Sequence, residues 1–104
     1  MIVIRNNIIP RPGFIAINVF GYLFARHGVF ISESTIRHEM IHTAQMKEML
    51  YIFFYIWYLI EWIIRLFLPG NAYRNIGFEK EAYANDNGIS YLETRKKYSW
   101  VKYL

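Results

Sequence analysis

The stretch 34–49 constrains the fold most, because it places two histidines four residues apart in a segment that contains no Gly or Pro. Ser34 can accept hydrogen bonds from the first free backbone N–H groups, so we expect a helix that begins at about this residue. On such a helix His38 and His42 share a face, and their imidazoles can converge on one zinc ion. Glu39, about 100° round the helix from His38, would reach a water on the same ion. We therefore predict that this helix carries a zinc site with Glu39 as general base.

Any zinc in this chain must be held by histidine and carboxylate, because none of the 104 residues is Cys. Ligands of that kind suit a catalytic zinc better than a structural one. The length predicts one small domain, 1–104, at a size where a bound metal would add useful stability. The chain is 55% hydrophobic and 19% aromatic, which indicates either a strongly aromatic core or a surface that meets lipid or a partner.

The N-terminal region does not have the pattern of a cleavable signal peptide, because two prolines and a glycine interrupt it between positions 10 and 13. We therefore expect a cytoplasmic or membrane-associated protein. Residues 1–9 predict a short strand that ends at this turn. Residues 14–26, rich in β-branched and aromatic side chains, predict a second strand, although a short buried helix or a membrane-dipping segment also fits. Residues 29–31 predict a short third extended piece.

Residues 50–68 form an apolar stretch in which only Glu61 and Arg65 are charged. By length alone this stretch could span a bilayer. Hydrogen-bonding and amphipathic side chains recur along it at steps of three and four, which gives one polar stripe on an apolar cylinder: Tyr51, Tyr55, Tyr58, Trp62 and Arg65. We favour a helix that packs in the domain core with this stripe facing the site or an interface, and the alternative is a transmembrane helix.

The run Pro69-Gly70-Asn71 ends this helix and lets the chain return alongside the histidine helix. Residues 78–92 predict a third helix whose first turn holds Glu79 and Glu81, where carboxylates favour the helix dipole. An Asn-Asp-Asn-Gly run at 85–88 ends or interrupts it. The expected fold class is therefore α+β, with two or three N-terminal strands followed by three helices, the first of which carries H-E-x-x-H.

The C-terminal stretch 93–104 holds four basic residues among aromatic ones, and the chain as a whole has a net charge of +4. Such a segment suits an anionic lipid surface, but a solvated basic face is the simpler interpretation. No recognisable nucleic-acid-binding module accompanies it, so we expect no nucleic acid partner.

The two patches HEMIHTAQ and FEKEAY resemble the gluzincin branch of zinc metalloproteases, in particular the HtpX-like and CAAX-prenyl-protease type and small minimal zincins. The resemblance covers only these two patches. In that branch a helix with H-E-x-x-H supplies two ligands and the general base, and a later helix supplies a glutamate ligand, often within E-x-x-A-D. The resemblance implies a minimal zincin-like domain in which Glu79 joins His38 and His42 on the metal.

The sequence leaves open which residue orients the first histidine and which glutamate is the third ligand. Tyr83 stands where the branch usually has an acidic residue that orients the first histidine, and Asp86 or Glu81 is a candidate for that role. The third ligand could also be Glu81 or Glu61. If 50–68 continued the histidine helix, Glu61 would lie about 28 Å from His42 and could not share its ion, whereas a turn near 47–50 would bring it back.

These observations predict a zinc-dependent metallopeptidase that hydrolyses peptide bonds with Glu39 as general base. The substrate would be a peptide or protein, which could pair with the edge of the strand at 14–24. Tyr83 is a candidate for stabilising the oxyanion, and Gln45 lies on the ligand face of the helix. The alternative is a non-enzymatic protein, either a degenerate zincin that serves as an interaction module or a small membrane-associated protein. A membrane surface and a second copy of the chain are further candidate partners.

Overall fold

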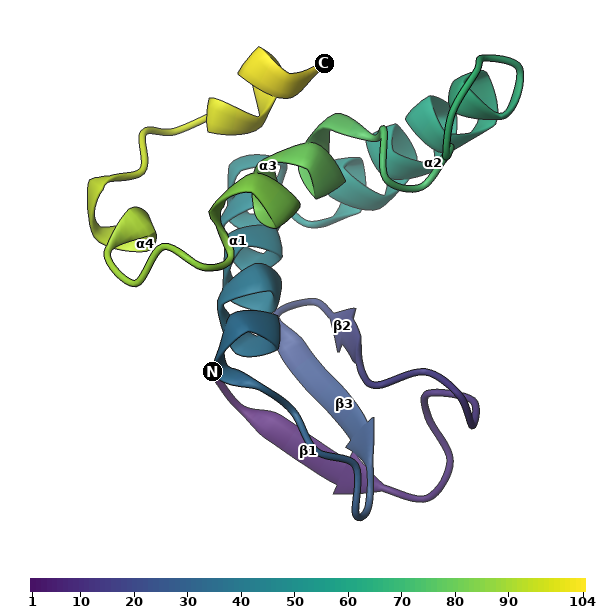
Figure 1. Cartoon of the computed structure of the whole chain (residues 1–104), viewed down its shortest axis with the longest axis vertical. Helices are drawn as coiled ribbons and strands as arrows, with labels where there is room; N and C mark the ends of the chain where they lie inside the picture. Colours follow the sequence, from purple (N-terminus) through teal and green to yellow (C-terminus); the bar gives the residue numbers. More distant parts are fainter.

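A computed structural model describes all 104 residues. The chain begins with a small three-stranded sheet (Figure 1). Its strands are β1 (Val3–Asn6), β2 (Ile17–Val19) and β3 (Tyr22–Arg26), in the order β1-β3-β2. β1 runs parallel to β3, and β2 runs antiparallel to it. β2 is therefore an edge strand, which leaves one side of it open.

The single strand predicted at 14–26 is wrong, because the chain forms a tight hairpin there. Phe20 and Gly21 have φ angles of 51° and 92°, and two positive φ values in a two-residue loop define the turn that best matches the twist of paired strands. The sequence does not predict this turn, because Phe is an unusual residue for a positive φ and the apolar pattern continues through it without a break. The extended piece predicted at 29–31 is not a strand.

The histidine helix is α1 (Glu33–Glu48), close to the predicted position. Its N-cap is Ser32, whose hydroxyl accepts from the backbone N–H of Thr35 at 3.1 Å. After α1, Leu50 and Tyr51 adopt positive φ angles, and the chain turns by 109° into α2 (Ile52–Leu66). A turn near 47–50 was one of the two alternatives at that point of the sequence, and it is the one observed.

The third predicted helix is interrupted, as the Asn-Asp-Asn-Gly run indicated. α3 (Gly77–Asn85) ends at that run, and two short helical pieces follow, α4 (Tyr91–Thr94) and the 3-10 helix η1 (Ser99–Tyr103). α3 lies beside α1, and η1 packs against α3 (Figure 1). A small N-terminal sheet followed by helices confirms the predicted α+β class.

The main core lies between α1, α2, α3 and η1. It comprises Met46, Phe54, Ile76, Phe78 and Trp100, with Phe54 stacked on Phe78 at a ring separation of 4.5 Å. Phe54 is the only fully buried residue of α2, although Tyr55 and Tyr58 also pack against the core, so the prediction that 50–68 packs in the core holds for one side of the helix only. No single helix has the length and apolar composition needed to cross a bilayer, and α1 and α2 together meet those criteria only as a bent pair.

Candidate metal centre

Two helices bring three potential ligand atoms to one point. His38 and His42 are one turn apart on α1, and Glu79 comes from the first turn of α3. The Nε2 atoms of the two histidines lie 3.1 Å apart, and each lies 3.0 Å from Oε1 of Glu79. All three residues are buried, with 7%, 5% and 4% of their surface exposed. The arrangement is thus a nearly equilateral triangle of nitrogen and oxygen atoms that water hardly reaches.

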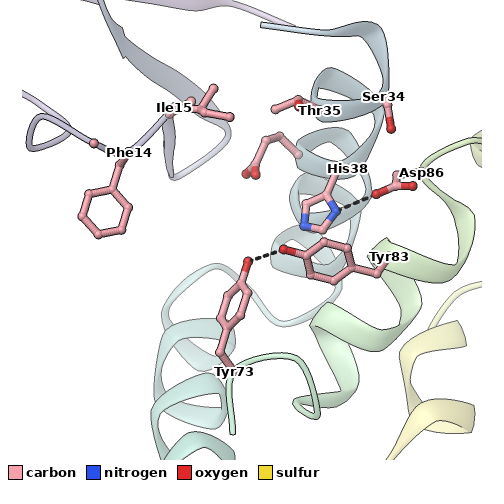
Figure 2. A pocket seen from close by; sticks show the side chains of 11 residues that line it. Phe14, Ile15, Ser34, Thr35, His38, Tyr73, Tyr83 and Asp86 are labelled. Atoms are coloured by element: carbon pink, nitrogen blue, oxygen red, sulfur yellow. Dashed lines mark hydrogen bonds and ion pairs between the residues drawn. The ribbon is translucent and has the colours of Figure 1, made fainter. Parts of the chain in front are cut away.

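The partners of the outer ring nitrogens decide which way each imidazole presents its lone pair. Nδ1 of His38 lies 3.2 Å from Oδ2 of Asp86 (Figure 2). Nδ1 of His42 lies 2.7 Å from the side chain of Gln45. A carboxylate only accepts hydrogen bonds, so Nδ1 of His38 carries the hydrogen.

The Gln45 amide is oriented by its other neighbours. Its nitrogen donates to the carbonyl oxygen of Phe78 and to Oε1 of Glu81, both at 3.0 Å, so its oxygen faces His42. Nδ1 of His42 therefore also carries its hydrogen. Each neutral imidazole then turns the lone pair of Nε2 toward the same point as the carboxylate oxygen of Glu79, and three lone pairs converge with no donor among them.

Such a cluster needs a positive charge at its centre, either a proton or a cation. With a proton there, burial lowers the pKa of His42, but the Glu79 carboxylate outweighs burial and raises it to about 9. Burial likewise raises the pKa of Glu79, and its contacts with His42 and His38 outweigh this and hold it well below the usual range. The three residues could equally hold a metal ion.

The donor set fits zinc. Tetrahedral coordination with bonds of 2.0–2.1 Å sets ligand atoms about 3.3 Å apart, close to the spacing of the three atoms here. Two imidazoles and one carboxylate are the ligands of a common class of catalytic zinc site, in which the fourth position stays open. The hydroxyl of Tyr58 in α2 donates to Oε2 of Glu79 at 2.7 Å, which leaves Oε1 alone to face the histidines.

The ligand cluster borders two adjoining cavities of about 360 and 320 Å³, which we call the two lobes of the cleft. The first lobe is bordered by His38 and the second by His42 and Glu79. Both lobes share Ala16, Glu39 and Tyr73. The predicted base Glu39 therefore lies where the lobes meet, and burial raises the pKa of its carboxyl.

The first lobe is the more polar of the two. Figure 2 shows this lobe with the side chains that line it. Tyr73 and Tyr83 point toward each other across it, with their hydroxyl oxygens 3.0 Å apart. The Tyr83 ring packs edge-on against His38 at 4.5 Å, and the Arg74 guanidinium covers its other side at 3.9 Å. Tyr83 thus supports His38 by packing. Asp86, one of the two candidates from the sequence, is the carboxylate that contacts the His38 ring.

The other glutamates considered as ligands lie elsewhere. Oε2 of Glu61 accepts from the backbone N–H of Gly77 at 2.9 Å and so caps α3. Glu81 is completely buried on the far side of Gln45 and binds Arg95. The remaining histidine, His27, is exposed in the turn after β3. None of these three reaches the cluster at His38, His42 and Glu79.

The prediction that the C-terminal charges form a solvated face is wrong for Arg95. Its side chain is only 5% exposed and contacts the carboxylates of Glu48 and Glu81. The hydroxyl of Tyr91 also donates to Glu81. This network links α4 to α1 and holds Glu81 against Gln45. It therefore supports His42 indirectly, through Gln45. No local sequence pattern predicts this network.

Comparison with known proteins adds nothing to this geometry: no protein-family model, no curated protein and no solved structure matches the chain.

Proposed function

We propose that this chain is a zinc-dependent peptidase of the minimal zincin type. The observation that carries the proposal is the convergence of the two Nε2 lone pairs and one Glu79 oxygen on a single buried point, with both outer nitrogens committed to Asp86 and Gln45. In metal sites, hydrogen-bond acceptors on the outer nitrogen of a histidine ligand fix the orientation of its ring. The H-E-x-x-H spacing and the downstream glutamate, which resemble gluzincins, support the same conclusion.

The residues divide the work of hydrolysis between them. When bound, zinc would supply Lewis-acid chemistry, since it polarises a carbonyl oxygen and makes a water molecule more acidic. Glu39, at the junction of the two lobes, accepts the proton of the attacking water and passes it to the leaving nitrogen. The hydroxyl of Tyr73, which borders both lobes, is better placed than Tyr83 to donate a hydrogen bond to the developing oxyanion.

An extended peptide suits the shape of the cleft. β2 pairs only with β3, and the residues that precede it, Ile15 and Ala16, pair with no other strand. Both residues border the first lobe, and Ala16 also borders the second. A substrate strand added to this edge would lie across Glu39, with one end in the polar lobe and the other in the apolar lobe beside Phe54.

The test is digestion of a mixed peptide library by the zinc-loaded chain and by Glu39→Gln. We expect cleavage by the wild type and none by the variant, because a carboxamide fills the same space but cannot accept the proton. The variant should retain its zinc, which separates loss of the base from loss of the site. An equally active Glu39→Gln chain would contradict the proposed role, and a zinc-loaded wild type that cleaves no peptide would contradict peptidase function.

A further inference from the structure

One half of α2 is an uncovered apolar surface. At 100° per residue, six of its aliphatic side chains fall within an arc of about 140°. Each is 45–55% exposed: Ile52, Ile56, Leu59, Ile60, Ile63 and Ile64. We call these six residues the outer face of α2. We propose that the outer face lies in the headgroup and acyl boundary of a membrane that contains anionic lipid.

The opposite side of α2 is the side that packs on the protein. Phe54 is buried in the core, Tyr58 binds Glu79, and Glu61 caps α3 at Gly77. The only charged residues of the helix, Glu61 and Arg65, both lie on this inner side, with side chains 11% and 24% exposed. The outer face therefore carries no charge, as is expected of the lipid-facing side of an in-plane amphipathic helix.

Trp57 and Trp62 flank the outer face on either side, and each is 39% exposed. Indole rings prefer the boundary between hydrocarbon and water, because they offer a large apolar surface and one N–H donor. Burial of the outer face to the depth of these two rings would place both of them at that boundary. A protein partner would not require tryptophan at both edges.

The C-terminal segment, part of which contacts α2, carries positive charge that would complement anionic headgroups. η1 packs beside α2, since Trp100 lies 5.5 Å from Trp57. Its C-terminal Leu104 borders a shallow groove together with Ile60 and Ile64. Lysines 96, 97 and 102 are exposed in and just before this segment, and the chain has a net charge of +4. Lysines beside an apolar surface are attracted to anionic lipid.

The net positive charge disfavours a second copy of the chain as the occupant. A symmetric dimer through the outer face would bring the same patch of two chains together, each with a net charge of +4. A lipid surface offers opposite charge instead. The proposal is independent of the metal centre, because the outer face turns away from the side that contacts Glu79.

The test is flotation of the full-length chain with mixed phosphatidylcholine and phosphatidylglycerol vesicles. We expect the wild type to float. In Ile56→Glu/Ile60→Glu/Ile63→Glu the vesicle partition coefficient should fall more than about tenfold, because three apolar side chains that enter the lipid are replaced by charged ones. A matched control places the same three charges on exposed apolar residues away from α2, as Ile8→Glu/Phe30→Glu/Ile89→Glu. This control should float like the wild type.

The lysines are tested separately. Lys96→Gln/Lys97→Gln/Lys102→Gln should bind the mixed vesicles more weakly at low salt and bind phosphatidylcholine vesicles unchanged. An unchanged affinity for the mixed vesicles would overturn the headgroup contribution. The proposal as a whole is overturned if the wild type does not float, if both triple glutamate variants lose flotation equally, or if sedimentation shows a lipid-free dimer that the outer-face variant dissociates.

Discussion

Oε1 of Gln45 lies 2.7 Å from Nδ1 of His42, and the amide nitrogen of the same side chain is held by Phe78 and Glu81. Gln45 is fully buried, so it cannot exchange these partners for water. One glutamine therefore fixes the tautomer of a candidate ligand and connects it to the Glu81–Arg95 ion pair. The candidate metal centre therefore depends on residues outside the H-E-x-x-H motif, among them Gln45, Glu81 and Arg95.

Replacing Gln45 with leucine should weaken zinc binding by about 10–100-fold, because the His42 ring loses the acceptor that orients it. Competition with a chromogenic chelator measures the change in zinc affinity. Met46→Leu, a neighbouring apolar exchange on α1, serves as the control and should bind zinc like the wild type. If Gln45→Leu is folded and binds zinc with wild-type affinity, the orienting role is wrong.

Asp86 should behave in the same way toward His38. Asp86→Ala removes the acceptor at 3.2 Å from Nδ1 and should also cost about 10–100-fold in zinc affinity. Asp86→Asn keeps an oxygen that can accept the same hydrogen bond, so its loss should be clearly smaller. Isothermal titration of the metal-free proteins compares the two variants. Equal losses would show that the negative charge, rather than the hydrogen bond, is what matters.

Arg95→Met should destabilise the fold by about 3–5 kcal/mol, because it leaves two carboxylates without their cation in a buried site. The Glu48 and Glu81 side chains are only 7% and 0% exposed, so water cannot replace the guanidinium. Urea unfolding measures the difference. The control, Lys97→Met, removes an exposed positive charge nearby and should change the free energy of unfolding by less than about 0.5 kcal/mol. Similar values for the two variants would contradict the buried network.

The stability of the metal-free protein should fall as the pH rises from about 6.5 to about 9. The folded pKa of His42 is raised from 6.5 to about 9, chiefly by Glu79 acting against burial. A raised pKa stabilises the fold fully below 6.5, and this stabilisation is lost as the pH passes through the folded value. With zinc bound the trend should reverse, because zinc competes with protons for the same nitrogen. Thermal melts across this pH range test both trends, and Glu79→Gln should flatten the metal-free curve.

The ligand cluster could be predicted from the sequence because its signal is local. The i, i+4 spacing of His38 and His42 needs only a helix, and the helix predicted from about Ser34 is observed at Glu33–Glu48, although Ser32 rather than Ser34 caps it. The third ligand was harder to predict, since the position of Glu79 depends on how α3 packs on α1. The prediction of Glu79 rests on the resemblance to the gluzincin pattern, and the structure brings this residue to the two histidines.

Two of the wrong predictions have the same physical cause: contacts between distant parts of the chain outweighed the local sequence pattern. Arg95 lies in a run of basic residues, and nothing in that run distinguishes the one arginine that α1 and α3 bury between two carboxylates. The Phe20-Gly21 turn is held partly by Tyr55 in α2, whose hydroxyl accepts from the Phe20 N–H at 3.0 Å. The apolar stretch 50–68 was expected in the core, yet the domain is too small to cover both sides of that helix.

Zinc content by native mass spectrometry tests the metal centre most directly. After metal-free dialysis and reloading, the wild-type chain should carry one zinc ion, and His38→Ala/His42→Ala and Glu79→Ala should each lose it. Glu61→Ala serves as the control, since Glu61 caps α3 and does not reach the cluster, and should keep its zinc. A wild-type chain that retains no zinc, or a double histidine variant that retains one zinc per chain, would contradict the proposed site.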